Sequence, residues 1–377
     1  MIKERYYRPE LDALRFLAFL CIFFVHRLDL APVDQSKYYW FHNISLLGNF
    51  GVPVFFLLSA FLITELLTRE AEQTGKIHPK AFYVRRILRI WPLYFLVFYG
   101  WVLLSTLVPE FALPPMAWFA FTFFAGNWYI SLKEWLPAYP LNPLWSISVE
   151  EQFYILIPLI AAYGGRRGLK IAAYLFFGIA YAFIIYYGMH PTNGFNSAWT
   201  NSFVHFQFFS VGILLSLYLK GSLPKIPPIL RFLMAFAALG SWWIASMVCG
   251  IHADAPHTST VVESVAGWLL ILFGVVLLFI SFLGSADNFF PKPLLYLGKI
   301  SYGLYVFHIS FFWLVYTRFD DELVAFSTFL HMYEWRNTIG FVIAFMLTVT
   351  VSMLSYRFLE KPFLRLKKQF TFVPSRD

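Results

Sequence analysis

The first long apolar stretch of the chain carries two basic side chains. Arg15 and His26 lie eleven residues apart within LDALRFLAFLCIFFVHRLD. On an α-helix, eleven steps of about 100° return to within about 20° of the starting direction, about 16 Å further along the axis, so both side chains share one face. Basic groups inside an apolar span are costly, and they are expected to face the protein interior and mark a path or a reaction site. The alternative is that Arg15 reaches the lipid headgroups and His26 sits at the outer rim.

A carboxylate follows this histidine closely. Asp29 comes three residues after His26, and on a continuing helix it could orient the imidazole ring. A histidine oriented in this way is suited to general-base catalysis, in which it removes the proton of an attacking hydroxyl. A solvated acid at a helix end is the competing interpretation of Asp29.

A basic cluster precedes the third apolar stretch, in RRILRIWPLYF. Arg86 and Arg89 are i,i+3 neighbours, so two guanidinium groups can point in one direction. Such a pair suits phosphate, because each guanidinium offers a planar fork of donors. Ordinary anchoring of a membrane protein by positive charge also explains these residues, since it needs no particular spacing.

Two adjacent glutamates begin an otherwise apolar helix in NPLWSISVEEQFYILIP. Ser148 and Glu151 form an S-x-x-E pattern that predicts a capping box, which is a sufficient structural reason for Glu151. Glu150 has no such reason. Glu150 is therefore the stronger candidate for a functional carboxylate, although the helix dipole favours any acid in a first turn.

A further histidine lies deep in an apolar stretch. ISYGLYVFH places His308 about nine residues, or about 14 Å, from the predicted cytoplasmic end of its span, near the bilayer midplane. A hydrogen-bonded histidine within a helix bundle is the alternative. The sequence has no HExxH, GxSxG or P-loop motif, and its two cysteines have no metal-ligand spacing, which excludes the common soluble hydrolase and kinase templates and predicts no metal site.

The elements that must hold these side chains are membrane helices. Of the 377 residues, 59% are hydrophobic, 21% aromatic and only 13% charged, about half the charged fraction of an ordinary soluble domain. So few polar side chains cannot cover a soluble protein of this size, whereas a lipid-facing surface needs none. The net charge of +8 comes from basic residues in short clusters between apolar runs, which indicates membrane topology and not a nucleic-acid-binding stripe.

Ten apolar stretches are long enough to cross about 30 Å of hydrocarbon. They predict an all-α, polytopic integral membrane protein with about ten transmembrane helices. The shorter run from Met116 to Ile130 could be an interfacial or re-entrant segment. The predicted spans lie near residues 11–30, 50–67, 90–108, 147–163, 170–189, 202–219, 229–250, 262–283, 300–316 and 338–358.

The distribution of lysine and arginine orients these spans. With a cytoplasmic N-terminus, the loops on the opposite side hold only Arg27, Lys37, Lys133, Arg318 and Arg336. The positive-inside rule therefore predicts that both termini are cytoplasmic. No loop is long enough for a soluble domain. We expect one membrane-embedded domain over residues 1–377, with a core at about 9–363 and a short cytoplasmic tail at 364–377.

Taken together, these segments resemble the acyltransferase 3 family. Members of this family are polytopic bacterial enzymes that move acetyl or other short acyl groups onto hydroxyls of sugars, glycans and some secondary metabolites. The matching segments are Arg15-x10-His26 within LDALRFLAFLCIFFVH, GVPVFFLLSAFLIT at 51–64, RRILRIWPLYF with Arg86 and Arg89, Asn127-Trp128-Tyr129, LWSISVEEQFYILIP at 144–158, KISYGLYVFH at 299–308 and SYRFLEKPF at 355–363.

The resemblance implies that His26 is the catalytic histidine and that Arg15, Arg86 and Arg89 are required, the last two for binding an acyl-coenzyme A donor. With the spacing arguments above, the catalytic candidates become His26, Arg15, Glu150 and Asp29. The sequence departs from the family at Ala13 and Ala60, where glycine is usual. Residues expected to line the site or to contact the acceptor are Ser59, Asn127, Trp145, Glu151, Tyr302 and His308.

The expected protein is thus a multi-pass O-acyltransferase of the bacterial inner (plasma) membrane. Its donor substrate would be acyl-coenzyme A, with acetyl-coenzyme A as the first candidate, and its acceptor a carbohydrate hydroxyl. No permanently bound cofactor and no nucleic acid are expected. Many relatives carry an SGNH hydrolase-like domain; none is expected here, so a separate periplasmic partner is an option. The competing classes are a transporter or flippase with Arg15, His26 and His308 as a relay, and a structural partner in glycan assembly.

Overall fold

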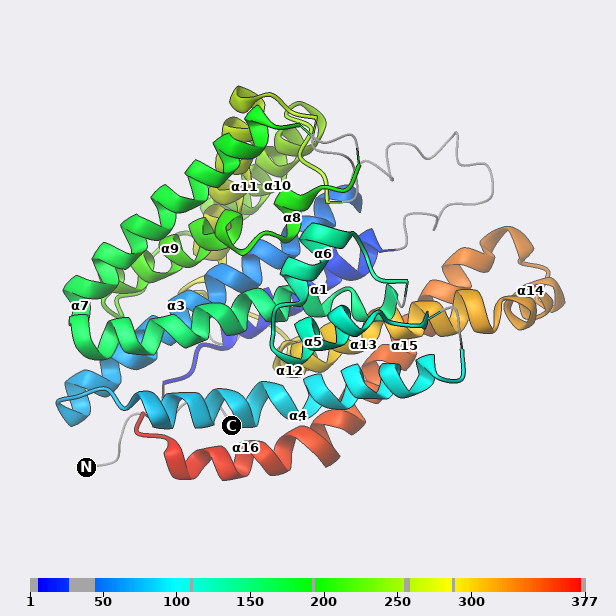
Figure 1. Ribbon diagram of the computed structural model, residues 1–377, viewed down its shortest axis with the longest axis horizontal. Coiled ribbons are helices and arrows are strands. Elements are labelled where there is room, and N and C mark those ends of the chain that lie inside the picture. Colours follow the sequence, from blue (N-terminus) through cyan, green and yellow to red (C-terminus); the bar gives the residue numbers. More distant parts are fainter. Residues whose placement is uncertain are drawn as a thin grey trace.

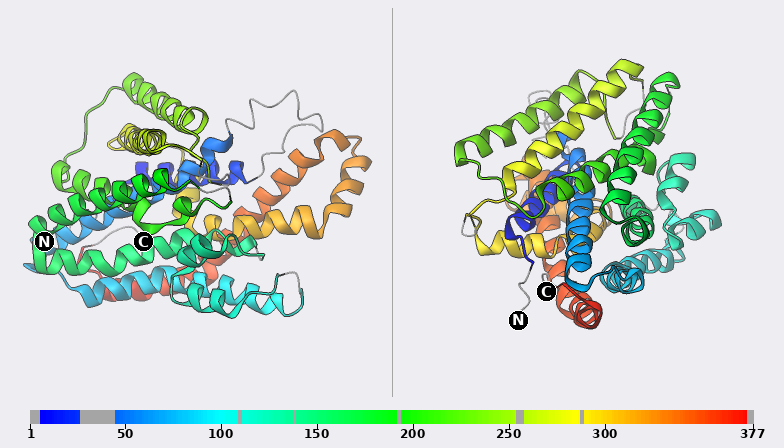
Figure 2. Two further views of the ribbon diagram at one scale, coloured as in Figure 1. Left: turned by 45° about the horizontal axis from the view of Figure 1, so that its top comes forward. Right: turned by 90° about the vertical axis from the view of Figure 1, so that its left-hand side faces the viewer.

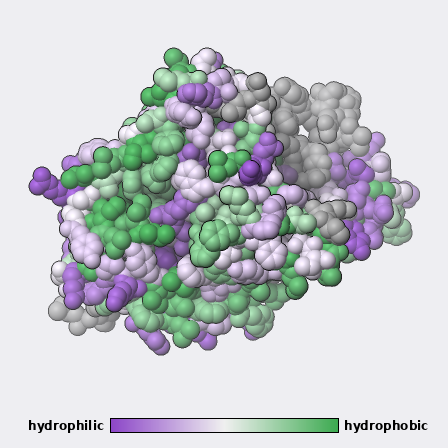
Figure 3. Space-filling model, viewed as in Figure 1, coloured by the Kyte–Doolittle hydropathy of each residue, from purple (hydrophilic) through white to green (hydrophobic). Residues whose placement is uncertain are grey.

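The computed structural model describes residues 6–26, 45–108, 111–137, 139–191, 194–253, 258–286 and 289–373 (Figure 1). Within these ranges every regular element is a helix, which confirms the all-α prediction. Many large apolar side chains are exposed on the helices. Figure 3 shows broad apolar areas on one face, as expected for helices that contact lipid, with hydrophilic residues at its left and right ends and smaller groups in its middle and at its top. Asp29 lies outside the described residues.

Seven stretches of the described chain are long and apolar enough to cross a membrane. An eighth is formed if the bent pair α12 (Lys292–Lys299) and α13 (Ser301–Trp313), whose axes differ by 75°, is one span. The chain is therefore a multi-pass membrane protein by length and composition, and the count of about ten stays a prediction. The long helices of the seven stretches are α3 (Gly51–Thr74), α4 (Pro79–Ser105), α7 (Leu144–Met189), α9 (Ser202–Leu219), α10 (Pro228–Met247), α11 (Val261–Phe282) and α15 (Arg336–Ser355).

Helix α7 accounts for part of the difference between the ten predicted spans and the seven stretches found in the described part of the structure. Its 46 residues would extend about 69 Å as a straight helix, about twice the hydrocarbon thickness. Gly165 interrupts it with φ 55° and ψ −152°, a backbone conformation that is open essentially to glycine alone. In Figure 1 the α7 ribbon turns back on itself. The spans predicted near 147–163 and 170–189 are thus the two arms of one bent element.

The segment expected to be interfacial or re-entrant forms two short helices. α5 (Pro115–Thr122) and α6 (Gly126–Lys133) are separated by a break at Phe124, whose φ is 54°. The Gln152 side chain of α7 donates a hydrogen bond of 2.8 Å to the Phe124 carbonyl, which fixes this break against the helix bundle. The remaining short helices are η2 (Leu47–Phe50), η4 (Tyr139–Leu141), α8 (Ser197–Thr200), η5 (Leu314–Arg318), α14 (Asp320–Phe329), η6 (Tyr333–Trp335), η7 (Tyr356–Glu360), α16 (Lys361–Lys367) and η8 (Lys368–Phe370).

Helix α1 (Pro9–Val25) carries Arg15 and is surrounded closely by its neighbours. A Cβ atom on Gly48 of η2 would lie 2.0 Å from the carbonyl oxygen of Cys21, and one on Gly298 of α12 would lie 1.8 Å from that of Asp12. Only glycine permits so close an approach of two backbones. These contacts hold α1 at two levels, near each end. By contrast, α10 and α11 form a pair at the outside of the bundle (Figure 2).

Candidate functional site

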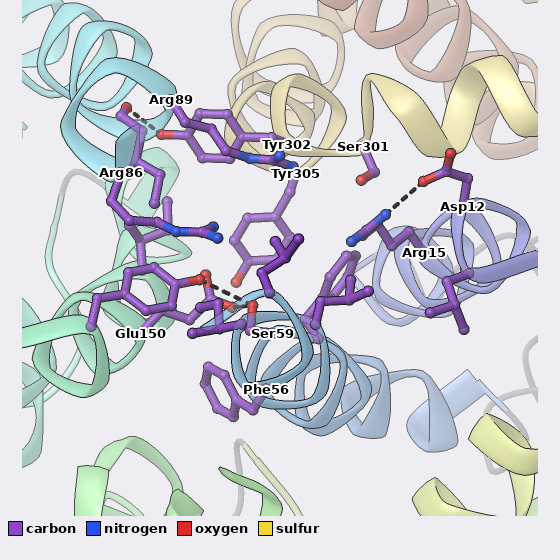
Figure 4. Close-up of a pocket in the computed structure, with 18 of the residues that line it drawn as sticks. Asp12, Arg15, Phe56, Ser59, Arg86, Arg89, Glu150, Ser301, Tyr302 and Tyr305 are labelled. Atoms are coloured by element: carbon purple, nitrogen blue, oxygen red, sulfur yellow. Dashed lines mark hydrogen bonds and ion pairs between the residues drawn. The ribbon is translucent and has the colours of Figure 1, made fainter. Parts of the chain in front are cut away.

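Helices α1, α3, α4, α7 and α13 enclose a pocket that we call the central pocket. It holds about 1230 Å³ of empty space, part of which is open to solvent. Its charged lining residues are four arginines and two acids, so the pocket carries an excess of positive charge and favours an anionic ligand. Figure 4 shows Arg86, Arg89 and Glu150 on one side of the space and Arg15 on the other. The charged lining residues are Arg8, Asp12, Arg15, Arg86, Arg89 and Glu150.

Arg86 and Arg89 lie on one face of α4, as the i,i+3 spacing predicted, and both line the central pocket. The Arg86 guanidinium lies over the ring of Tyr154, 5.1 Å from its centre, and 5.4 Å from that of Phe82. Among the described residues, no acceptor takes a hydrogen bond from either guanidinium, and neither forms an ion pair at contact distance. Both groups are only partly exposed. Their donors are therefore available to a ligand in the pocket, and phosphate oxygens suit them.

Neighbouring Arg85 is engaged elsewhere. It donates hydrogen bonds to Glu70, at 2.9 Å, and to the carbonyl oxygen of Phe370, at 2.7 Å. Glu70 in turn accepts a hydrogen bond from the backbone N–H of His78 at 2.9 Å. Arg85 thus fastens the C-terminal segment to the beginning of α4, and it does not line the central pocket.

Arg15 faces the central pocket from α1. It donates a hydrogen bond of 2.6 Å to Asp12, one turn earlier, and the hydroxyl of Tyr7 donates to the other carboxylate oxygen at 3.0 Å. The Asp12 side chain is buried, so this ion pair fixes the guanidinium in direction. The geometry fits an interior position for Arg15, not one among lipid headgroups.

Ser59 and Glu150 also line the central pocket, and they contact each other. The Ser59 hydroxyl donates a hydrogen bond to Oε1 of Glu150 at 2.5 Å and lies 3.0 Å from the hydroxyl of Tyr154. Trp145, five residues before Glu150, points elsewhere: it lines the second pocket described below and contacts the rings of Phe56 and His205. Tyr302 lines the central pocket, and its hydroxyl donates to the Ile90 carbonyl at 2.8 Å.

His26 lies in a second pocket, which we call the His26 pocket. This space of about 700 Å³ is lined by aromatic and polar residues of α7, η4 and the α6–α7 connection, among them Trp135, Tyr139, Asn142 and Trp145. The two pockets share Val52 and Tyr305. The Tyr305 hydroxyl is 2.7 Å from Ser146 Oγ and 3.0 Å from the carbonyl oxygen of Pro143, which fixes its ring between the pockets.

His308 lies against His26. Their ring centres are 5.2 Å apart, with a 43° angle between the planes. His308 is fully buried, and its Nδ1 is 2.6 Å from the carbonyl oxygen of Tyr305. The expected partner of His26, Asp29, belongs to the part of the chain that the structure leaves undescribed.

Two predicted site residues lie away from both pockets. Glu151 accepts a hydrogen bond of 3.2 Å from the indole of Trp91 and lines neither the central pocket nor the His26 pocket. Asn127 is fully buried, donates to Ser202 Oγ at 2.9 Å and accepts from Gln152 at 2.8 Å. Its contacts connect α6 to α7 and α9.

The capping box predicted from Ser148 and Glu151 is wrong. Helix α7 begins at Leu144, four residues before Ser148, with Pro143 at its N-cap position and no side-chain cap. The Ser148 hydroxyl instead donates to the Leu144 carbonyl at 3.4 Å, within the helix. An S-x-x-E pattern can occur inside a helix, and here Pro143 supplies the start of the helix.

Sequence reasoning missed Tyr305, Tyr154 and Asp12. A usable signal existed for all three of them. Tyr305 stands three residues from both Tyr302 and His308, and Asp12 three residues before Arg15, so each shares a helix face with a predicted site residue. Tyr154 is four residues after Glu150 and could have been found in the same way.

Comparisons with known proteins cover almost the whole chain. Residues 8–357 match a family described as an acyltransferase domain, acyltransferase 3. A protein of Staphylococcus aureus strain MSSA476, provisionally named an O-acetyltransferase, is 28% identical over 386 residues. The O-acetyltransferase OatA of Staphylococcus aureus strain NCTC 8325 is 27% identical over 393 residues.

These alignments cover 96% and 98% of the present chain but only 58% and 59% of the two relatives. The chain therefore spans less than two thirds of the length of the curated relatives that it matches. No solved structure matches the chain.

Proposed function

The chain belongs to the acyltransferase 3 family, and from this premise we propose that it is a membrane O-acyltransferase that moves an acetyl or other short acyl group from acyl-coenzyme A to a carbohydrate hydroxyl. One observation carries the proposal. A basic pocket, in which Arg86 and Arg89 have no acceptor among the described residues, and a pocket containing an imidazole meet at two shared side chains, Val52 and Tyr305. The central pocket would suit a donor with phosphate groups and a long arm. The imidazole of His26 would then lie near the end of that arm and could act as a base.

The donor end of the proposal rests on the arginines. Arg86 and Arg89 would bind phosphate groups of coenzyme A through paired N–H donors, and Arg15 would add charge from the opposite wall. Apolar side chains between them, such as Phe55 and Leu62, would contact the pantetheine arm. The thioester would then lie near Tyr305, where the central pocket adjoins the His26 pocket.

His26 is the proposed general base. The acceptor oxygen attacks the carbonyl carbon of the thioester while an unprotonated ring nitrogen of His26 takes the hydroxyl proton. The carbon–sulfur bond breaks, and the proton passes from His26 to the sulfur of coenzyme A. A base in this position contributes roughly 10²- to 10⁴-fold to the rate. An acyl-histidine intermediate is the alternative route to the same products.

The acceptor side of the proposal rests on the composition of the His26 pocket. Trp135, Tyr139 and Trp145 offer flat apolar rings, and Asn142 offers polar atoms, a combination that suits a sugar. We infer a protein of the bacterial plasma membrane with both termini in the cytoplasm, a cytoplasmic donor and an acceptor on the other side. The charge asymmetry of the loops supports this orientation.

The test uses the purified full-length chain in liposomes. Acetyl-coenzyme A labelled in the acetyl group is supplied with a panel of soluble oligosaccharides, and labelled product and free coenzyme A are measured. We expect transfer by the wild type and none above background by His26→Ala. His190→Ala is the matched control, because His190 is an exposed histidine at the end of α7. Wild-type transfer by both variants would refute the role of His26. Substrate transport without acyl transfer would favour a transporter.

A second arm tests the sidedness. In sealed vesicles of known orientation, acetyl-coenzyme A is expected to support transfer only from the cytoplasmic face, and an impermeant oligosaccharide only from the opposite face. Transfer with both substrates confined to the cytoplasmic face would contradict the orientation while leaving the acyltransferase activity intact.

A further inference from the structure

The buried imidazole of His308 has one ring nitrogen bonded and the other unbonded. Its Nδ1 lies 2.6 Å from the carbonyl oxygen of Tyr305, one turn earlier on α13. A carbonyl oxygen can only accept a hydrogen bond, so the proton of the ring is on Nδ1. In a neutral imidazole of this tautomer, Nε2 is an acceptor. Among the described residues, nothing donates a hydrogen bond to this fully buried atom.

Among the described residues whose rings contact His308, one remains as a candidate partner for Nε2. Phe19, Phe23 and Phe312 contact the ring and have no polar atoms. The hydroxyl of Tyr305 is already placed between Ser146 and the Pro143 carbonyl. The remaining ring neighbour is His26, with 5.2 Å between the ring centres. Each ring nitrogen lies at the edge of its ring, so this separation leaves space for one N–H···N hydrogen bond.

We propose that His308 is a positioning residue for His26, with its Nε2 accepting a hydrogen bond from a ring N–H of His26. This deepens the proposed function and rests on it. The bond would fix the tautomer of His26, so that its second nitrogen is unprotonated and directed into the His26 pocket. The two rings are not hydrogen-bonded in the structure, and a rotation of the exposed His26 side chain would form the bond. Such bonds often tighten only when substrate is bound.

The role follows the chemistry of the reaction. While the unprotonated nitrogen of His26 takes the acceptor proton, His26 becomes an imidazolium, and the lone pair on Nε2 of His308 stabilises its other N–H group. When the coenzyme A thiolate leaves, His26 returns the proton to the sulfur. His308 keeps its own proton on Nδ1 throughout, so no proton is gained or lost at this residue.

The chain contains a closely matched control for this proposal. His205 is also fully buried, its Nε2 lies 2.6 Å from the carbonyl oxygen of Trp199, and its Nδ1 has no partner among the described residues. Its ring neighbours are Phe56, Phe208 and three tryptophans, not another histidine. A purely structural role would make the two histidines equivalent.

The kinetic experiment compares His308→Leu, His308→Gln and His205→Leu in liposomes. It uses acetyl-coenzyme A and the oligosaccharide that supports the fastest transfer. His308→Leu has similar volume but no acceptor. We expect kcat to fall by roughly 10- to 100-fold, by analogy with the groups that orient metal-bound imidazoles, with KM for acetyl-coenzyme A unchanged. His308→Gln keeps a side-chain acceptor and is expected to recover part of kcat. His205→Leu is expected to change protein yield more than kcat.

Asp29→Asn is measured beside them, because Asp29 is the competing orienting group. A larger loss of kcat in Asp29→Asn than in His308→Leu would overturn the proposal. Equal kcat in His308→Leu and the wild type would also overturn the proposed role of His308. The proposed function would stand in that case, because the wild type would still transfer the acyl group. Absence of transfer by the wild type would instead refute the proposed function.

A spectroscopic arm does not depend on turnover. Nitrogen-15 NMR of the histidine-labelled chain in liposomes separates protonated from unprotonated ring nitrogens, and the signals of His26 and His308 are assigned from His26→Ala and His308→Leu. We expect His308 protonated at Nδ1 and unprotonated at Nε2, and we expect His308→Leu to shift the His26 signals. His308 protonated at Nε2, or His26 signals that do not change, would overturn the proposal.

Discussion

The hydroxyl of Ser59 on α3 donates a hydrogen bond to Glu150 on α7, at 2.5 Å from Oε1. The same hydroxyl lies 3.0 Å from that of Tyr154, whose ring is in turn covered by the Arg86 guanidinium. Residues from α3, α4 and α7 therefore form one connected cluster on the wall of the central pocket. A substitution of Ser59 should therefore change the position of the Arg86 guanidinium, which we assign to donor binding.

The first prediction concerns this serine. Ser59→Ala removes one hydrogen bond to the partly buried Glu150 carboxylate, and the loss of a hydrogen bond to such a group costs about 1–3 kcal/mol. We expect a lower thermal stability and a KM for acetyl-coenzyme A raised several-fold, whereas Ser59→Thr, which keeps the hydroxyl, should remain close to wild type. Thermal unfolding in detergent and steady-state kinetics check this. Equal effects of alanine and threonine would show that volume matters here and the hydroxyl does not.

The second prediction separates Arg86 and Arg89 from their neighbour. Replacing either of them by glutamine should weaken coenzyme A binding, and lysine should recover it only in part, because a point charge cannot supply a bidentate fork. Arg85→Gln is the matched control, since Arg85 is bonded to Glu70 and the Phe370 carbonyl and does not line the central pocket. Calorimetric titration with coenzyme A measures the affinities. An unchanged affinity for coenzyme A in the Arg86→Gln, Arg89→Gln double variant would indicate that both residues only anchor the protein in the membrane.

The third prediction concerns the side chain shared by the two pockets. Tyr305→Ala removes the ring that separates them and should raise the relative rate with longer donors, measured as the ratio of butyryl to acetyl transfer. Tyr305→Phe keeps the ring, loses the bonds to Ser146 and Pro143, and should preserve that ratio. Tyr302→Ala is the control, because Tyr302 lines the central pocket alone. An identical ratio in all variants would mean that Tyr305 does not limit the acyl group.

The fourth prediction is topological. Reporters inserted after Lys220 and fused to the C-terminus should lie in the cytoplasm, and one between Pro191 and Asn201 should lie outside, because the lysines and arginines favour this arrangement. Two enzymatic reporters that are active on opposite sides of the membrane check each position. A C-terminal reporter on the outside would require an odd number of spans.

The sequence predicts well those features that depend on one helix at a time. Apolar length locates the helices, and the 3.6-residue period correctly places Arg86 and Arg89 on one face of α4. The same period brings Arg15 to the central pocket. The two apolar stretches predicted near 147–163 and 170–189 are the two arms of one helix bent at Gly165, a continuity that the sequence did not indicate.

Features that depend on two helices are harder to predict. Ser59 and Glu150 are 91 positions apart, and no periodicity relates residues on different helices. Local patterns can also mislead. The S-x-x-E pattern at Ser148 predicts a helix start there, whereas the helix begins earlier, directly after Pro143. Even so, the preference for Glu150 over Glu151 agrees with the geometry, since Glu150 lines the central pocket and Glu151 does not.

The close glycine contacts of α1 have a consequence for how this chain can vary. Gly48 and Gly298 fix the backbone of α1 near Cys21 and near Asp12, so the helix cannot slide to compensate for a change in its length. One inserted residue between Arg15 and His26 would turn one side chain by about 100° relative to the other and separate them by about 1.5 Å more. The distance between these two side chains is therefore fixed. It would have to match the distance between the phosphate and the thioester of a bound donor. Insertions and deletions should be tolerated in the loops of this protein and rejected within these eleven positions.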